Sequence, residues 1–129
     1  MAIFENTYTK MWVQEGILYS IYKPIPHLTS EIAKVCVQAR LDFSEGKTYP
    51  LFGDIRLIRK MDKDARGYLS SGDGIKYLNS GAFIINSPVE KMLINFWTKI
   101  DKPPLPVRVF NDEQSAIEWL KQYVPLIKK

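Results

Sequence analysis

The 129-residue chain has few of the features that mark a specialised class of protein. Its single cysteine, Cys36, cannot form an internal disulfide or a cysteine zinc site. No apolar run approaches the roughly 20 residues that span a bilayer. The first residues, MAIFENTYTK, lack the basic segment and following apolar stretch of a secretory signal. These absences predict a cytoplasmic protein that does not insert into a membrane.

The chain also lacks a concentrated patch of one charge. Its 18 lysines and arginines exceed its 14 aspartates and glutamates, for a formal net charge of +4, but the two signs are interleaved along the sequence. A nucleic-acid-binding protein is expected to gather its cations in a stripe. The sequence therefore predicts no nucleic-acid partner. The length and the 46% hydrophobic content predict one domain over residues 1–129 with one real core.

Strand-like and helix-like segments alternate along the chain. Two runs rich in aromatic and β-branched residues, 8–14 and 17–23, flank Glu15-Gly16 and predict a β-hairpin. Further strands are predicted at 49–55, 80–86 and 107–110, and helices after Thr29 or Ser30, after Asp62, over 87–100 and over 111–124. This order predicts a single α/β domain with a mostly parallel five-stranded sheet and about four helices.

Two helices have features that a structure can test. In the first helix, six residues at helical spacing are expected to form the face toward the core: Leu28, Ile32, Val35, Cys36, Ala39 and Phe43. At the start of the last helix, Asn111 and Gln114 resemble a capping box, in which side chains bond to free backbone N–H groups.

The segment KMDKDARGYLSSGDG, residues 60–74, combines acids and glycines in a way that suggests a metal or phosphate loop. An EF-hand loop starting at Asp62 would place Arg66, a cation, at a ligand position, and it would follow a strand instead of a helix. The glycine spacing fits neither a P-loop nor a dinucleotide loop. The segment is better read as a helix entry, with Asp62 as N-cap and Asp64 in the first turn.

A helix entry does not explain why the strand before it ends in the charged residues Asp54 and Arg56. In an open α/β sheet, the ends of parallel strands and the helix starts that follow them lie at one edge, where ligands and partners bind. That edge would also present Asn86 and Ser87, which follow the next strand. We therefore expect a binding surface there, and we expect no metal site and no cofactor.

The strand YPLFGDI, a short connector, an acid and then a helix together resemble the core of the STAS, or SpoIIAA-like, fold of anti-sigma-factor antagonists. Several further segments, among them DARGYLSSGDG, SGAFIINSP and NFWTKIDKPPLP, resemble a group of small uncharacterised bacterial STAS-like proteins. The similarity extends over about residues 8–124. It implies a regulatory protein-interaction module whose binding face surrounds the start of this helix.

The chain departs from the family pattern at the switch. STAS proteins of this kind open the helix with Asp-Ser, and a partner kinase phosphorylates the serine. Here Asp62 takes the place of the aspartate, but Lys63 stands where the serine belongs. The resemblance therefore implies partner binding without a phosphoswitch.

The leading hypothesis is a non-enzymatic regulatory module that binds an unknown protein partner. The predicted binding residues are Asp54, Arg56, Asp62, Lys63, Asp64, Arg66, Asn86 and Ser87. The alternative is a small-ligand or lipid-binding domain with an apolar pocket lined by Trp12, Phe96, Trp97 and Trp119. A hydrolase is less favoured, because it would need Asp54 and Asp62 close together and no nucleophile has a visible base. Aromatic residues on the hairpin (Tyr8, Trp12 and Tyr19) leave a homodimer open.

Overall fold

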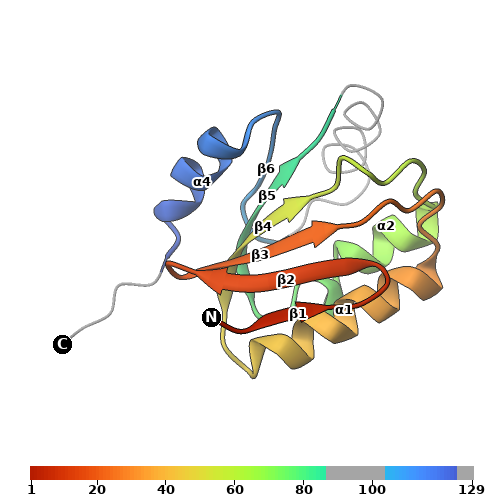
Figure 1. Cartoon of the computed structure of the whole chain (residues 1–129), viewed down its shortest axis with the longest axis horizontal. Coiled ribbons are helices and arrows are strands. Elements are labelled where there is room, and N and C mark those ends of the chain that lie inside the picture. Colours follow the sequence, from red (N-terminus) through yellow and green to blue (C-terminus); the bar gives the residue numbers. More distant parts are fainter. Residues whose placement is uncertain (87–103, 125–129) are drawn as a thin grey trace.

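The computed structural model describes residues 1–86 and 104–124. In this part of the chain, six strands form one sheet in sequential order, and two α-helices, a 3-10 turn and a third α-helix connect or follow them (Figure 1). The elements are β1 (Ile3–Glu5), β2 (Thr9–Gln14), β3 (Ile17–Tyr22), α1 (Ser30–Ser44), β4 (Tyr49–Asp54), α2 (Lys63–Leu69), η1 (Gly72–Gly74), β5 (Leu78–Ile84), β6 (Val107–Phe110) and α4 (Glu113–Lys121).

The sheet combines an antiparallel and a parallel half. β1, β2 and β3 pair antiparallel, whereas β3, β4, β5 and β6 pair parallel. The predicted α/β domain with a mostly parallel sheet is confirmed. The predicted strand number of five was wrong, because β1, which is three residues long, adds a sixth strand to the edge. Such a short strand has too few residues to show an alternating pattern.

The predicted hairpin joins β2 to β3. Glu15 and Gly16 both have positive φ angles, 52° and 81°, as the favoured two-residue hairpin turn requires. A side chain at Gly16 would also collide with Val124, since an added Cβ would lie 2.6 Å from a Val124 methyl carbon. The turn therefore depends on glycine for its backbone angle and for close packing.

The first helix, α1, begins where the sequence predicts. The Thr29 hydroxyl accepts a hydrogen bond from the backbone N–H of Ile32 at 3.2 Å, so Thr29 is the N-cap. The helix ends at Ser44, and the two residues that follow it, Glu45 and Gly46, have left-handed backbone angles.

The predicted core face of α1 was partly wrong. Val35 is exposed, and the buried residues are Ala33, Cys36, Val37, Arg40 and Ser44. This face has helical spacing, but it contains an arginine and a serine that an apolar pattern cannot reveal. Both are buried with hydrogen-bond partners: the Ser44 hydroxyl donates to the carbonyl of Arg40, and the Arg40 guanidinium donates to three carbonyls near η1.

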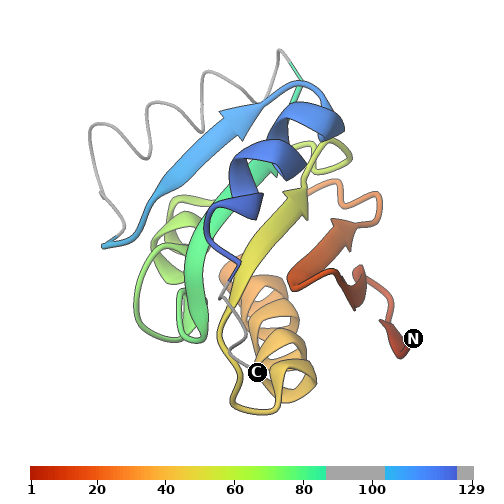
Figure 2. The ribbon, with the colours of Figure 1, turned by 90° about the vertical axis from the view of Figure 1, so that its left-hand side faces the viewer.

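Helices cover the two faces of the sheet unequally (Figures 1 and 2). On one face, α1 and α2 pack against a core that includes Leu28, Ala33, Ile58, Ala65 and Ile85. On the other face, α4 packs toward the β6 edge over a core of Ile17, Phe52, Ala82, Ile84, Ala116 and Leu120. Successive residues of a strand point to opposite faces, so the neighbours Leu51 and Phe52 of β4 belong to clusters on opposite sides of the sheet.

Two further predictions concern the C-terminal part of the chain. The helix predicted over 87–100 lies outside the described residues. The last helix forms, but its N-cap is Asp112, whose carboxylate accepts from the N–H of Ser115 at 2.8 Å. The capping box predicted from Asn111 and Gln114 was therefore wrong by one residue. Within residues 1–86 and 104–124, no helix has the length and apolar character to cross a membrane.

Candidate functional site

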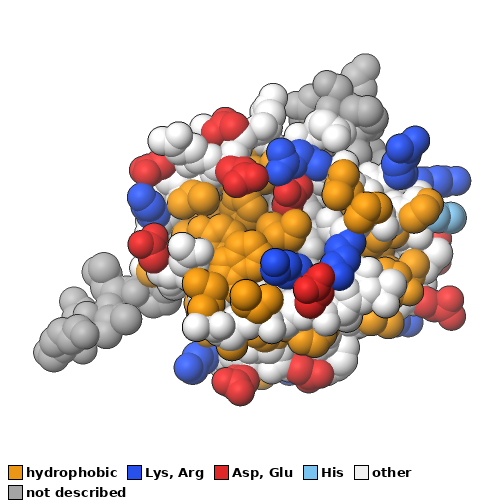
Figure 3. Space-filling view, viewed as in Figure 1, with side chains coloured by type: hydrophobic (Ala, Val, Ile, Leu, Met, Phe, Trp, Pro, Cys, Tyr) orange, Lys and Arg blue, Asp and Glu red, His pale blue; other side chains and the backbone are white. Residues whose placement is uncertain are grey.

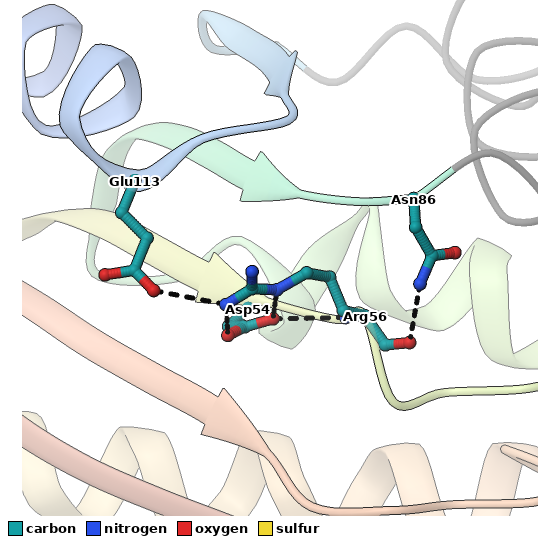
Figure 4. A network of polar contacts seen from close by, with 4 residues as sticks. All are labelled: Asp54, Arg56, Asn86 and Glu113. Carbon is teal, nitrogen blue, oxygen red and sulfur yellow. Dashed lines mark hydrogen bonds and ion pairs between the residues drawn. The ribbon is translucent and has the colours of Figure 1, made fainter.

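A charged cluster lies where β4 ends. Asp54 is the last residue of β4, and Arg56 follows two residues later. The Arg56 guanidinium donates from Nε to Asp54 Oδ1 at 3.0 Å and from Nη2 to Oδ2 at 2.7 Å (Figure 4). The backbone N–H of Arg56 also donates to Oδ1 at 3.1 Å. These bonds form a turn that fixes both side chains and gives the two-point geometry in which arginine binds carboxylate best.

Two other segments meet the cluster. At the first residue of α4, Glu113 Oε2 accepts from Arg56 Nη2 at 3.1 Å. After β5, the Asn86 side-chain amide donates to the Arg56 backbone carbonyl at 3.2 Å. Figure 4 shows the four residues together, reaching one another from three separate parts of the chain. Arg56 therefore connects the exits of two parallel strands to the start of α4.

The exposed fraction of the side chains increases across the cluster. The side chain of Asp54 is 13% exposed, that of Arg56 38% and that of Glu113 59%. The hydrogen bonds that Arg56 donates to Asp54 raise the pKa of Arg56, and Glu113 adds to this effect. Among the described residues, Arg56 Nη1 makes no hydrogen bond. An incoming polar group could therefore meet a guanidinium N–H and the exposed carboxylate of Glu113.

An apolar area lies beside the cluster on the same face of the sheet. The strand register places Ile3, Trp12, Tyr19 and Phe52 in one row across β1 to β4. The Trp12 and Tyr19 rings are stacked with centroids 5.1 Å apart, and the Tyr19 and Phe52 centroids are 5.0 Å apart. The next row along the same face contains Ile21 and Asp54. We call this row of Ile3, Trp12, Tyr19 and Phe52 the aromatic row.

The aromatic row is only partly covered. α4 packs over the part of this face that lies nearer β6, while Trp12 and Tyr19 remain partly exposed and Ile3 is exposed. Figure 3 shows a hydrophobic area over β2, β3 and β4 with charged side chains around it. The register places Glu5 in the row of Ile21 and Asp54, and Glu5 forms an ion pair with Lys23 at 2.6 Å.

The predicted site residues fall into two groups. Asp54, Arg56 and Asn86 come together as described, whereas Asp62, Lys63, Asp64 and Arg66 belong to the start of α2, which packs on the opposite face. Ser87 lies outside the described residues. Whether either group binds a partner stays a prediction.

Asp62 lies at the N-cap position of α2, as predicted, but its side chain does not cap the helix. Its Oδ1 instead contacts Nε2 of His27, in the loop before α1. Sequence spacing gave no reason to join residues 35 positions apart. The parallel bridge between Leu28 and Met61 brings the two loops side by side.

Glu113 is the cluster residue that the sequence-based site omitted. A signal was present, because Glu113 lies three residues after the end of β6, at the strand-end edge that holds Asp54 and Asn86. The helix start was expected at Asn111, and so Glu113 was expected within the helix instead of at its first residue.

The aromatic pocket of the alternative hypothesis does not form around the described tryptophans. Trp12 stacks on Tyr19, and Trp119 packs against Phe110 and Tyr123. Neither tryptophan lines the internal cavity on the α1 side of the sheet. Phe96 and Trp97 lie outside the described residues. In the part of the chain that the structure describes, no group of three or more His, Cys, Asp or Glu residues could hold a metal ion.

Comparisons with known proteins agree with this architecture. Residues 11–124 match a family model described as Domain of unknown function (DUF7793). No curated protein matches the chain. The crystal structure of an uncharacterized protein of the DUF3478 family from Shewanella loihica PV-4 is similar, with a TM-score of 0.56 and 16% identity over 92% of this chain and 99% of that one. Its fold is described as SpoIIAA-like, which confirms the resemblance inferred from the sequence.

Proposed function

The chain belongs to the DUF7793 family, and we propose that it is a non-enzymatic regulatory module that binds another protein through the α4 side of its sheet. The observation that supports this most is the continuity of the aromatic row with the Asp54–Arg56–Glu113 cluster. The two features are adjacent because the rows of Tyr19 and of Ile21, the register partner of Asp54, are neighbours.

The composition of this face is that of a protein-binding surface. Binding interfaces combine a dry apolar centre with a polar rim, and tryptophan, tyrosine and arginine supply most of their energy. Trp12 and Tyr19 would form the centre, with Arg56 and Glu113 at the rim. Stacking restrains the two rings, and Asp54 restrains Arg56, so little side-chain entropy remains to be lost on binding.

The positions of the acids favour binding over hydrolysis. Asp54 is bonded to Arg56, and Asp62 contacts His27 near α2, so each carboxylate has its own partner. A hydrolase using both would need them to face one shared substrate position. Their separate partners give no such position.

The proposal includes no serine switch. Lys63 is the first residue of α2 and is exposed, at the position where the resemblance places the phosphorylated serine. A lysine there cannot accept that phosphate. The proposed binding therefore does not depend on phosphorylation at position 63.

Two surface variants test the proposal. The sheet variant combines Trp12→Ser with Glu113→Lys, and the matched α2 variant combines Lys63→Glu with Asp64→Lys, all at surface positions. Each tagged protein is used to capture partners from extract of the organism's own cells, with quantitative mass spectrometry. Proteins captured by the wild type and by the α2 variant should fall at least about tenfold with the sheet variant, since hot-spot losses commonly exceed 1.4 kcal/mol. Undiminished capture by the folded sheet variant would overturn the proposal.

A further inference from the structure

A cavity of about 70 Å³ lies on the α1 side of the sheet, away from the proposed protein-binding face. Side chains from β3, α1, β4, α2 and β5 line it, and most of them are apolar, such as Leu51, Ile58 and Phe83. Its polar lining residues are separate from the Asp54–Arg56 cluster. Two arginines, Arg40 and Arg66, contribute to it.

Arg40 is a buried cation without an ion pair in the described residues. It is 5% exposed, and its guanidinium donates to the carbonyls of Lys76 at 2.7 Å, Asp73 at 3.1 Å and Gly74 at 3.2 Å. These carbonyls satisfy part of its hydrogen-bonding capacity but do not neutralise its charge. Burial lowers the pKa of Arg40 accordingly. Buried charges normally have a partner of opposite sign.

A hydroxyl group on the opposite wall adds an independent observation. Ser20, on β3, is 5% exposed and lines the cavity. Among residues 1–86 and 104–124, its side chain makes no hydrogen bond. The hydroxyl is therefore available to bond to a group in the adjoining cavity.

The charged residues of the lining are all basic in the part of the chain that the structure describes. None of the described residues around the cavity is an aspartate or a glutamate, although two are arginines. A ligand there would lie beside two arginines, a hydroxyl donor and an apolar wall. Those features attract an anion with an apolar part and disfavour a cation.

We propose that this cavity binds a small carboxylate with a short aliphatic chain, its anionic end toward Arg40 and Ser20. A water-sized group needs roughly 10–15 Å³ of such a cavity, so 70 Å³ holds about five groups. Propionate has five non-hydrogen atoms and fits this estimate. The carboxylate would neutralise the buried charge, and its aliphatic carbons would contact Leu51, Ile58 and Phe83.

The direct test is titration of the whole ¹⁵N-labelled protein with propionate, followed by NMR, with propionamide as the neutral ligand of equal size. Propionate should bind saturably and shift the amide signals of Ser20, Val37 and Gly74, and propionamide should bind at least about tenfold more weakly. Equal binding of the two ligands, or propionate shifts confined to other regions, would overturn the proposal.

Variants separate the cavity from general surface charge. Arg40 is avoided, since its bonds support η1, and Arg66→Gln is used with the exposed Arg59→Gln as its matched control. Ser20→Val, which adds apolar volume to the wall, gives a second measurement if Arg66→Gln fails to fold. Arg66→Gln or Ser20→Val should weaken propionate binding at least about fivefold, and Arg59→Gln should not. Unchanged binding to a folded Arg66→Gln or Ser20→Val protein would contradict the assignment.

Discussion

The rings of Trp12 and Tyr19 lie stacked across β2 and β3, with an angle of 3° between their planes. This pair lies in the partly covered row of the sheet, next to the row that ends in Asp54. Most aromatic side chains of a small α/β domain serve the core. These two are held rigid where a partner can reach them, beside a cluster of fixed charges, and the proposed function rests on that arrangement.

The Asp54–Arg56 pair should contribute modestly to stability. Arg56→Lys keeps the positive charge but loses the two-point contact, and it should lower the free energy of unfolding by about 1 kcal/mol, because Arg56 is partly exposed and water screens the pair. Asp54→Asn should cost more than Glu113→Gln, since Asp54 is the more buried carboxylate. Urea unfolding of the three variants checks this order, and the reverse order of the two acids would contradict the geometry.

Gly67 and Gly74 form a matched pair for one substitution. An added Cβ at Gly67, within α2, meets nothing within 4 Å, so Gly67→Ala should raise the free energy of unfolding by about 0.5–1 kcal/mol. At Gly74 the same carbon would lie 2.1 Å from the backbone oxygen of Tyr68, so Gly74→Ala should lower it by roughly 2 kcal/mol or more. Thermal or urea unfolding measures both changes. Similar values for the two variants would show that η1 does not pack as described.

The buried side chain of Arg40 should stabilise the η1 segment through its hydrogen bonds. Arg40→Met leaves the carbonyls of residues 73, 74 and 76 without their donor and should lower the free energy of unfolding by about 3 kcal/mol. Hydrogen exchange should speed up selectively at residues 72–78. The exposed Arg59→Met serves as control and should change neither quantity. An unaltered exchange pattern in Arg40→Met would mean that these hydrogen bonds do not hold the segment.

Cys36 should make the protein less stable at alkaline pH. Burial raises the pKa of its thiol to about 12, so the unfolded chain loses this proton first as the pH rises. The buried neutral thiol makes its full contribution to the free energy of unfolding below about pH 9. This contribution is lost between about pH 9 and 12, by at most about 1.4 kcal/mol per pH unit. Urea unfolding at pH 8 and pH 10.5 should show a smaller alkaline loss in Cys36→Ala than in the wild type. Equal losses would contradict the burial of the thiol.

The sequence was sufficient for features set by local chemistry. The hairpin at Glu15-Gly16, the Thr29 cap and the strand–helix alternation follow from turn residues, capping residues and periodicity, and the structure confirms them. Asp54 and Arg56 were both predicted to lie at the strand-end edge, because they stand at the end of an apolar strand. Their ion pair was not predicted, although it spans only two residues.

Local sequence patterns could not predict the interactions between distant segments. Glu113 joins Arg56 across 57 positions, His27 meets Asp62 across 35, and Arg40 reaches carbonyls more than 30 residues away. Helical spacing placed Val35 toward the core and did not bury Arg40, because a hydrophobic pattern cannot foresee a cation held by backbone carbonyls. The division of the predicted site between two faces of the sheet likewise required the three-dimensional arrangement.

Site-specific photo-crosslinking in living cells tests the central claim most directly. A benzophenone amino acid is introduced at Trp12 in one protein and at Lys63, on α2, in another, and the crosslinked products are compared after irradiation. We expect a discrete crosslink to a second protein from position 12, lost when Glu113→Lys is added, and no such product from position 63. Crosslinking from position 63 with none from position 12 would contradict binding through the α4 side of the sheet.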